Sequence, residues 1–457
     1  MKISTKFRKI SFSIVLLIVL FDSCKKDDII QTPPVTKVTN AYSGEQVRGY
    51  FSLLCTISQT TPGFFPPQVS RAYGYIGITN YEAVVNGIVG AQSLGGQLNG
   101  LANSDLPKIV AGLSYNWAIS SNAAIADMMR KMFADKISSI NSAKIDSIEL
   151  ANLTSLSLGE NNEVVNRSVQ FGKDISVSIY KYSTTDGGDK SYMDPFQLPF
   201  ALPLDSFCWV PTGVAQHPIS PNWGSNRPFL SVNVSNTQPS APINFSIVPG
   251  SAFYKEAMDM YTQVKSNTAD QVEITRYWAD DPFNTCTPTG HTFNIMTQLL
   301  EENRATLEKT SVAYARLAIA ENDAFISCWK GKYKYFLIRP VSYIKKYIDA
   351  SFSTVIGTPP FPAYTSGHSC EMGAGSRVMI SLFTDGSGNY QFTDYSQLRY
   401  GFAARNFSNF NEMADECAKS RFYGGLHYNM DNTRGLQVGR AIGDNVNKMI
   451  NWPHNIK

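Results

Sequence analysis

The chain has 457 residues, of which 43% are hydrophobic and 17% are charged, a composition that fits a globular protein with a sizeable core. This length is enough for one large domain or two ordinary ones. The formal net charge is only +3, so the composition shows no basic footprint for nucleic acid, and nucleic acid is not an expected partner. Any basic character must be local.

The first 24 residues have the character of an export signal. The basic residues at the start are Lys2, Lys6, Arg8 and Lys9. An apolar run from Ile10 to Phe21 follows, and it is too short for a comfortable membrane span. Cys24 comes next and is similar to the lipidated cysteine of bacterial lipoproteins, although Asp22 stands where a small residue is usual. A plain secretory signal is the alternative.

Residues 25–43 predict a solvated tether. They begin with the charged run Lys25–Asp28 and include the Pro33–Pro34 pair, a composition that does not favour packing. On this interpretation the protein is an exported bacterial lipoprotein. It would be anchored to a membrane through a lipid on Cys24 and would face the periplasm or the cell surface.

Apolar residues at helical spacing dominate the remaining sequence, and strand signals are sparse. The helices predicted in the first half are Glu45–Ser58, Val69–Val89, Leu106–Phe133 and Glu160–Tyr182. Those predicted in the second half are Ala252–Val264, Ala269–Trp278, Thr292–Arg304, Leu307–Lys330, Ser366–Phe383, Gln397–Lys419 and Asn432–Ile450. We therefore predict an all-α fold of two packed helical bundles, residues 44–250 and 251–457, with the active site in the second.

Residues 183–245 have a different character from the helices around them. They are rich in proline, glycine and aromatic residues and have no sustained period, which predicts a long irregular connection at the end of the first half. A connection of this length within a compact fold is usually functional or covers something. We expect it to pack over the helices near the mouth of the active site.

Cysteine spacing does not indicate a zinc site. Besides Cys24 the chain has six cysteines and no Cys-x-x-Cys pair. An exported protein can form disulfides whose pairing the sequence does not define, whereas the helical apolar surroundings of several cysteines favour buried free thiols. Residues 385–389 resemble part of a calcium loop, but the closing glutamate is missing and a tight turn is the better interpretation.

The stretch 420–431 joins an arginine, a histidine and an aspartate. Arg421 has a permanent charge and a fixed fork of donors that suits an oxyanion. His427 has a ring nitrogen that can act as a nucleophile or a metal ligand. Asp431 lies one helical turn later, where it can bond the other ring nitrogen and fix its tautomer. Taken alone, the stretch could equally be a helix start with a surface ion pair.

Two upstream stretches supply further groups for an oxyanion. Lys332 and Arg339 add positive charge, and the proline after Arg339 keeps that arginine in extended backbone at a helix boundary. Ser366 and Gly367 begin a helix, so a hydroxyl and a backbone N–H can bind an anion there. His368 comes directly after them and can transfer a proton to or from a bound oxygen.

The three stretches read Lys-x6-Arg-Pro, Ser-Gly-His and Ser-Arg-x5-His-x3-Asp. This pattern resembles the signature of the superfamily of type 2 phosphatidic acid phosphatases and vanadium haloperoxidases, and all three blocks are present in order. The resemblance implies a site for vanadate or phosphate formed by Lys332, Arg339, Ser366, Gly367 and Arg421. It also implies that His427 is the vanadium ligand or the nucleophile that forms a phosphohistidine, with Asp431 behind it and His368 as the acid–base group.

The residues around the motifs resemble the chloroperoxidase-like bacterial branch of this superfamily. Trp329 and Phe361 stand where that branch has aromatic residues of the halide pocket, and packing in the core is the alternative for both. Asp280 and Asp281 stand in a region where an aspartate pairs with the motif arginine. Thr365 departs from the proline that is usual before the Ser-Gly-His block, which loosens the turn and keeps the anion donors.

The motifs use two of the five histidines in the chain. His217 and His454 lie in irregular or terminal stretches, and we interpret them as structural or exposed. His291 ends a Pro-Thr-Gly-His turn that faintly resembles the Ser-Gly-His block. We interpret that turn as the N-cap of the helix predicted from Thr292 rather than as a second site.

The leading hypothesis is a vanadate-dependent haloperoxidase-like enzyme that uses hydrogen peroxide to oxidise a halide to hypohalous acid. The second hypothesis is an acid phosphatase that cleaves a phosphate ester in the same pocket, because vanadate mimics the pentacoordinate phosphoryl transition state. A non-catalytic surface binding lipoprotein is the third, and the complete motif set argues against it. The sequence does not define the halide, the organic substrate or the oligomeric state.

The export signal makes one testable prediction. Replacing Cys24 by serine removes the sulfur that would carry the lipid, so the variant should be released as soluble protein or keep its signal uncleaved. Membrane fractionation and mass spectrometry of the mature N-terminus check this, with Cys208→Ser as a control that should stay in the membrane fraction. Native protein without lipid, starting at another residue, would contradict the assignment.

Overall fold

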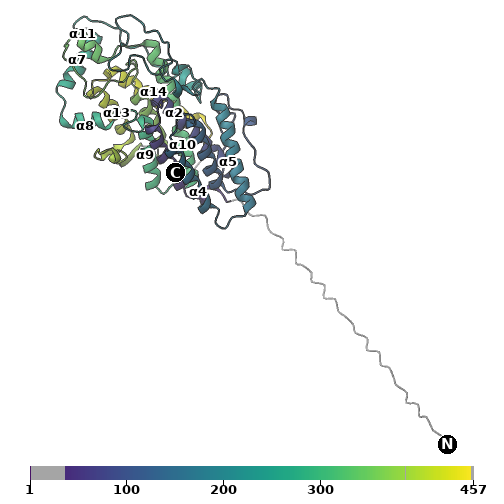
Figure 1. Cartoon of the computed structure of the whole chain (residues 1–457). Helices are drawn as coiled ribbons and strands as arrows, with labels where there is room; N and C mark the ends of the chain where they lie inside the picture. Colours follow the sequence, from purple (N-terminus) through teal and green to yellow (C-terminus); the bar gives the residue numbers. More distant parts are fainter. Residues whose placement is uncertain (2–36, 386–387, 454–457) are drawn as a thin grey trace. The chain divides into compact units, whose positions relative to one another are not determined.

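The structure is a computed structural model that describes Met1 and residues 37–385 and 388–453 (Figure 1). Residues 2–24 of the predicted export signal, including Cys24, lie outside the described residues. So do residues 25–36 of the predicted tether, two residues of the predicted 385–389 turn, and His454. Within the described range, no helix has both the length and the apolar character that crossing a bilayer requires.

Helices dominate the described chain, which confirms the predicted all-α class. The helices of the first half are α1 (Glu45–Thr60), α2 (Pro66–Val84), α3 (Trp117–Phe133), α4 (Ser139–Leu156), α5 (Asn162–Ser183) and the short α6 (Val232–Ser235). Those of the second half are α7 (Ala252–Lys265), α8 (Ala269–Tyr277), α9 (Thr287–Glu302), α10 (Leu307–Tyr335), α11 (Pro340–Tyr347), α12 (Gly367–Phe383), α13 (Phe410–Tyr423) and α14 (Asn429–Met449). Strands β1 (Asn389–Asp394) and β2 (Arg405–Asn409) pair antiparallel. Short 3-10 turns lie at Thr39–Ala41, Val85–Gly87, Asn103–Asp105, Ser191–Met193, Trp223–Ser225 and Leu398–Tyr400.

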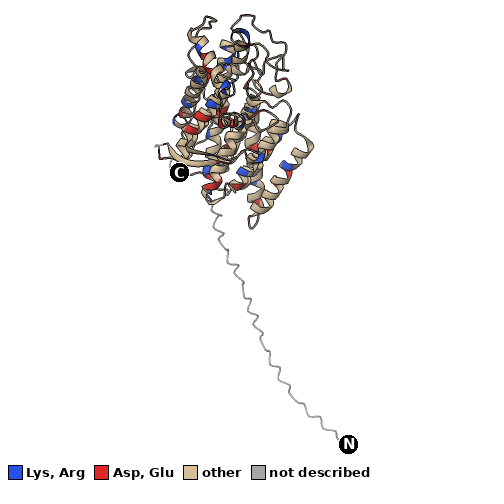
Figure 2. Ribbon diagram, turned by 90° about the vertical axis from the view of Figure 1, so that its left-hand side faces the viewer, with Lys and Arg blue, Asp and Glu red and all other residues tan. Residues whose placement is uncertain are grey.

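Helix α10 lies at the centre of the packing. It contacts α2 of the first half and α12 and α14 of the second, and Figure 1 shows it between α4 and α5 on one side and α7, α8 and α11 on the other. The described residues from Lys37 onward form one compact unit, and the main hydrophobic cluster includes residues of both halves. Lysine, arginine and acidic residues lie intermingled over the helices (Figure 2), in keeping with the small net charge.

Glycines allow α12 and α14 to pack closely. A Cβ on Gly439 of α14 would lie 1.9 Å from the carbonyl oxygen of Cys370 in α12, and one on Gly443 would lie 2.5 Å from that of Ala374. Any larger residue would force the helices apart. The contact bears on the predicted site because residues 366–368 and 427–431 lie at the N-terminal ends of α12 and α14.

The predicted irregular connection is present and packs on α10. Asp323 of α10 accepts hydrogen bonds from the backbone N–H groups of Phe229 (2.7 Å) and Leu230 (2.9 Å) and from the Asn233 amide (2.9 Å). Further along, the Ile219 carbonyl accepts bonds from the side chains of two residues near the C-terminal end of α10, Trp329 and Tyr333. The connection therefore covers the end of α10 that carries the Lys-x6-Arg block.

Some predicted helix limits are wrong, for reasons that the structure shows. Helix α3 begins at Trp117 rather than at Leu106, because Pro107 and the left-handed Gly112 (φ +79°) interrupt the pattern and the Asn116 side chain caps the helix. Helix α13 begins at Phe410 rather than at Gln397, because much of that stretch belongs to the hairpin of β1 and β2.

Besides the four-residue α6, two helices were not indicated by the sequence patterns. Helix α4 buries only Asn141 and Ile145, so its apolar periodicity is too weak to stand out. Helix α11 has eight residues and begins directly after Arg339. The cysteines of the described chain are all buried free thiols, which agrees with the second of the two interpretations of their spacing: Cys55, Cys208, Cys286, Cys328, Cys370 and Cys417.

Candidate active site

The three sequence blocks meet where α12 and α14 begin and α10 ends. The backbone N–H of Ser366 donates to the Asp431 carbonyl (3.2 Å), the Lys332 ammonium donates to the Thr365 carbonyl, and Arg339 Nη1 lies 3.1 Å from His427 Nε2. Residues that lie up to about one hundred positions apart in the sequence thus form one buried cluster. The structure brings all the predicted anion-binding and histidine residues together here.

His427 and Asp431 form the pair that their spacing predicts. His427 Nδ1 lies 3.1 Å from Asp431 Oδ2, which also accepts the backbone N–H of Tyr428 (3.2 Å). Because Nδ1 donates its hydrogen bond to the carboxylate, His427 Nε2 keeps its lone pair and accepts from Arg339 Nη1 (3.1 Å). Burial lowers the pKa of His427 well below its usual range, and Arg339 lowers it further. The ring is therefore neutral, and a ligand or an electrophile at Nε2 would replace the bond from Arg339.

Arg339 is fully buried and lies in extended backbone before α11, as its following proline predicts. Its Nε donates to the Phe361 carbonyl (2.8 Å) and its Nη1 donates to the Leu426 carbonyl (2.9 Å). Its Nη2 has no hydrogen-bond partner among the described residues, although it is buried. A buried guanidinium donor without a partner is costly unless a further acceptor is present, so Nη2 is available to an anion.

Lys332 binds backbone carbonyls, a role that the sequence did not indicate. Its ammonium donates to the carbonyl oxygens of Pro362 (2.9 Å), Ala363 (3.1 Å) and Thr365. An ammonium has three protons, so these carbonyls use all of its donors. Lys332 therefore holds the turn before the Ser-Gly-His block and contributes its charge to the site. In this structure it does not present a free donor.

Ser366 and Gly367 form the start of α12. The Ser366 Oγ accepts the N–H of Ser369 (3.4 Å), which is the usual bond of an N-cap. The N–H groups of the first helical turn, including those of Gly367 and His368, have no partner within an α-helix. They point toward the site together with the positive end of the helix dipole, which favours an anion.

Arg421 and His368 are both held by backbone carbonyls of one segment. Arg421 Nη1 donates to the Trp278 carbonyl (2.8 Å), and its buried Nε has no partner among the described residues. The His368 ring bonds the Ala279 carbonyl. His368 Nε2 is buried and has no hydrogen-bond partner in the described chain. Burial lowers the pKa of His368 well below its usual range, and Arg421 adds to the shift, so Nε2 carries a lone pair.

Asp281 acts more strongly than Asp280 on the charge of the motif arginine. Burial lowers the pKa of Arg421, and the charge of Asp281 is the largest effect that opposes it. The side chain of Asp280 instead faces His291. The sequence pointed to both aspartates, and only the three-dimensional structure separates them.

The two predicted pocket aromatics pack against the cations. The ring centroids of Trp329 and Phe361 are 5.0 Å apart, and the Phe361 ring lies 4.9 Å from the Arg339 guanidinium carbon and 5.0 Å from Lys332 Nζ. Cation–π contacts of this kind stabilise a positive charge that has lost its water. The rings also exclude water from the site. Among the predicted site residues, only His368 is partly exposed, so it lies nearest the entrance.

These residues fit a tetrahedral oxyanion. The unpartnered buried donors Arg339 Nη2 and Arg421 Nε, the free amides of the first turn of α12 and the charge of Lys332 all suit its oxygens. His427 Nε2 offers one nitrogen to the central atom. Vanadate and phosphate both have this shape and charge, and His427 with these donors would hold either of them.

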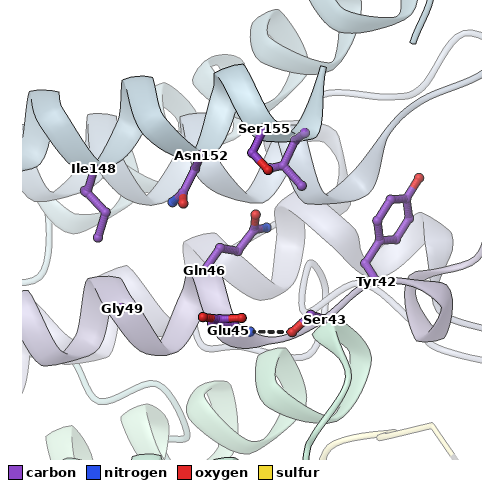
Figure 3. A pocket seen from close by; sticks show the side chains of 9 residues that line it. Tyr42, Ser43, Glu45, Gln46, Gly49, Ile148, Asn152 and Ser155 are labelled. Atoms are coloured by element: carbon purple, nitrogen blue, oxygen red, sulfur yellow. Dashed lines mark hydrogen bonds between the residues drawn. The ribbon is translucent and has the colours of Figure 1, made fainter. Parts of the chain in front are cut away.

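Sequence reasoning missed the backbone carbonyls that position the site. Those of Trp278, Phe361 and Leu426 hold arginines, and those of residues 362–365 hold Lys332. No side-chain pattern reports a carbonyl contact, so no sequence signal could have found them. A separate hollow of about 440 Å³ lies between α1 and α4 (Figure 3), and none of the predicted site residues lines it.

Comparison with known proteins agrees with this geometry. Residues 348–455 match the family model described as the VCPO second helical-bundle domain. A solved bacterial vanadium-dependent iodoperoxidase has 29% sequence identity and a TM-score of 0.80, and the match covers 91% of this chain and 98% of that one. No curated protein sequence matches the chain.

A bacterial vanadium-dependent chloroperoxidase shares the fold alone. Its holo form has 14% identity and a TM-score of 0.65 over 86% of this chain and 93% of that one. Its apo form has 13% identity and a TM-score of 0.66 over 90% of this chain and 98% of that one. Fold and site together define a helical protein with a buried oxyanion site centred on a histidine. The domain match and the structural similarity together support the vanadium haloperoxidase superfamily, bacterial branch, for this chain.

The contacts of Lys332 predict a structural role that is independent of any anion. Lys332→Met should leave three buried carbonyls without their donor and lower the free energy of unfolding by about 2–4 kcal/mol in anion-free buffer, since an unsatisfied buried group costs about 1–3 kcal/mol. Urea denaturation measures this. Lys334→Met, an exposed position on the same helix, is the control and should change stability by less than about 0.5 kcal/mol. Equal stability of the two variants would show that the turn does not depend on Lys332.

The charge of Lys332 also predicts how anion affinity depends on pH. Burial lowers the pKa of Lys332 to about 8, so its positive charge is present below that pH and is lost as the pH rises. The affinity for sulfate, a dianion throughout this range, should be flat below pH 8 and then fall by at most about tenfold per pH unit. Burial lowers the pKa of Arg339 only to about 9, so the fall that begins between pH 8 and pH 9 reports mainly on Lys332. Calorimetric titration between pH 7 and pH 10 tests this, and a flat profile would exclude a role for the Lys332 charge.

Proposed function

We propose that this protein is a vanadate-dependent haloperoxidase, which uses hydrogen peroxide to oxidise a halide to hypohalous acid. The observation that carries the proposal is the pair of buried arginine donors, Arg339 Nη2 and Arg421 Nε, that have no partner within the described chain. They lie in the same buried site as His427 Nε2, whose lone pair accepts from Arg339 Nη1. The iodoperoxidase at 29% identity supports the same conclusion.

The residues of the chain would divide the work between holding the anion and moving a proton. His427 would bond the vanadium through Nε2, and Asp431 would keep that nitrogen unprotonated and correctly oriented. Arg339, Arg421 and the amides that begin α12 would bind the oxygens, with the charge of Lys332 behind them. Vanadate bound in this way would supply a Lewis-acid centre that activates hydrogen peroxide toward a halide.

His368 would transfer the proton of the incoming peroxide. Burial keeps its ring neutral and its Nε2 has no partner in the described chain, so Nε2 could accept a proton from an incoming peroxide and later return it to an oxygen. Its partial exposure places it between the buried cations and solvent. Trp329 and Phe361 would keep water away and form part of the halide pocket, as their contacts with the cations suit a second, weakly hydrated anion.

An acid phosphatase is the second candidate function. It is favoured by the same His427 Nε2, because a neutral imidazole nitrogen beside a bound phosphate is also a nucleophile. In that reaction His368 would protonate the leaving alcohol. We further propose that the protein is an exported lipoprotein anchored through Cys24, which fractionation of the Cys24→Ser variant tests.

Replacing His427 should impair vanadate binding, whereas replacing His368 should impair halide oxidation. His427→Ala removes the only protein atom that would bond vanadium, so vanadate affinity should fall by at least about 10–100-fold, the range for loss of a residue that merely supports a ligand. His368→Ala leaves the anion donors in place, so vanadate should still bind, while halide oxidation should fall by roughly 10²–10⁴-fold. Calorimetric titration with vanadate and peroxide-dependent oxidation of iodide, bromide and chloride separate these outcomes.

The exposed His217 provides a matched control, because His217→Ala should keep both vanadate affinity and activity. Hydrolysis of p-nitrophenyl phosphate by the vanadate-free protein, without halide oxidation when vanadate is added, would favour the phosphatase. Tight anion binding with neither activity would favour a binding lipoprotein. If His427→Ala bound vanadate as tightly as wild type, His427 would not be the vanadium ligand.

A further inference from the structure

Residues 278–281, here called the 278–281 segment, join α8 to α9 and orient two residues of the site through their backbone. The Trp278 carbonyl accepts Arg421 Nη1 (2.8 Å), and the Ala279 carbonyl accepts from the His368 ring. A shift of this segment would turn both side chains at once. Whatever holds its backbone in place therefore helps to set the geometry of the anion donors and of the proton-transfer group.

The backbone of this part of the chain is not one that its residues adopt readily. Asp280 (φ +48°), Phe283 (φ +70°) and Thr287 (φ +65°) are all in the left-handed region, although none of them is glycine. Such conformations persist only where surrounding contacts hold them, and they concentrate at functional sites. The 278–281 segment therefore needs strong side-chain contacts to keep its shape.

His291 of α9 provides those contacts. Its Nδ1 lies 2.9 Å from Asp280 Oδ2 and its Nε2 lies 3.1 Å from Asp394 Oδ2, and all three side chains are buried. Each ring nitrogen faces a carboxylate, which accepts and does not donate, so both nitrogens carry protons and the ring is an imidazolium. Gln397 Nε2 lies 2.8 Å from both Asp280 Oδ1 and His291 Nδ1 and donates to the carboxylate.

The same imidazolium supports Trp278 through its ring. The centroids of Trp278 and His291 are 4.6 Å apart with an angle of 24° between the planes, a stacked arrangement that favours a cation beneath the indole. Trp278 Nε1 also donates to Glu416 Oε1 of α13 (3.0 Å). His291 thus contacts the side chains of both Trp278, whose carbonyl holds Arg421, and Asp280.

The hairpin of β1 and β2 supplies the other side of this cluster. Asp394 is the last residue of β1, and Gln397 lies in the turn after it. Burial disfavours a charge on His291, but Asp280 and Asp394 outweigh it and raise the pKa of His291 to about 10. The hairpin, the 278–281 segment and α9 are thus joined by one buried cation between two acids.

We propose that His291 is a positioning residue for the active site: clamped between Asp280 and Asp394, it fixes the 278–281 segment and thereby the orientation of Arg421 and His368. The inference rests on the proposed function in one respect, because Arg421 and His368 are taken as the anion donor and the proton-transfer group. His291 itself touches neither of the reacting groups, and its effect passes through the backbone carbonyls of Trp278 and Ala279.

The test compares His291→Gln with His217→Gln, the same change at an exposed histidine. Glutamine can donate to only one of the two carboxylates, so the segment should loosen. Vanadate affinity measured by calorimetry should fall about 10–100-fold in His291→Gln, as for other residues that support a ligand, and remain at the wild-type value in His217→Gln. The kcat for halide oxidation should fall as well.

A second measurement separates positioning from a simple loss of stability and does not depend on activity. In ¹⁵N-histidine NMR well below the melting temperature, His368 should show one tautomer in wild type and a mixture of tautomers in His291→Gln. A merely structural role would lower the melting temperature and leave this signal unchanged. Folded His291→Gln with wild-type vanadate affinity and an unchanged His368 signal overturns the proposal.

Asp394→Asn covers the case in which His291→Gln does not fold. It keeps one oxygen acceptor opposite His291 Nε2 and removes only the charge, so it should shift the His368 signal in the same direction and weaken vanadate binding by a smaller factor. An unchanged His368 signal in this variant overturns the proposal. Should wild type bind vanadate without oxidising halide, the proposed function fails while the tautomer measurement still decides the role of His291.

Discussion

The structure depends on the burial of three cations without an acid in direct contact. Lys332, Arg339 and Arg421 are 0%, 0% and 2% exposed, and in the described chain none of them has a carboxylate within salt-bridge distance. Removing a charge from water costs several kcal/mol even after the protein relaxes. Backbone carbonyls and aromatic rings offset part of this cost, and two arginine donors remain without a partner. The site is therefore arranged for an anion as the missing partner.

The carbonyls that hold these cations come from non-helical segments. Within a helix most carbonyls already bond an N–H of the next turn, whereas the residues 278–281, 359–366 and 424–428 have carbonyls that are free to accept from side chains. The helices deliver the cations and histidines, and the loops between them supply the acceptors. Close packing of α12 on α14 through Gly439 brings the two sets together.

The arrangement explains why one pocket suits two reactions. Under the proposed function, the His427 Nε2 lone pair would serve as a metal ligand or as a nucleophile, and a neutral His368 with an unpartnered Nε2 would serve as a base and, once protonated, as an acid. The geometry of the donors is the same for vanadate and for the phosphoryl group it mimics. The reaction therefore depends on which oxyanion is bound and on how accurately the 278–281 segment and its partner His291 orient the donors.

The sequence by itself determined the helical class, the residues that carry the chemistry and the His427–Asp431 pair, because helical periodicity and a four-residue spacing are local properties. The tertiary structure alone decided the partners of those residues. It directs the Lys332 donors to carbonyls, holds Arg421 by the Trp278 carbonyl and turns Asp280 toward His291. It also forms strand β2 within a predicted helix, since a short strand is stabilised by a partner across a loop and not by its own pattern. Contacts between distant segments, and carbonyls above all, leave no side-chain signal in the sequence.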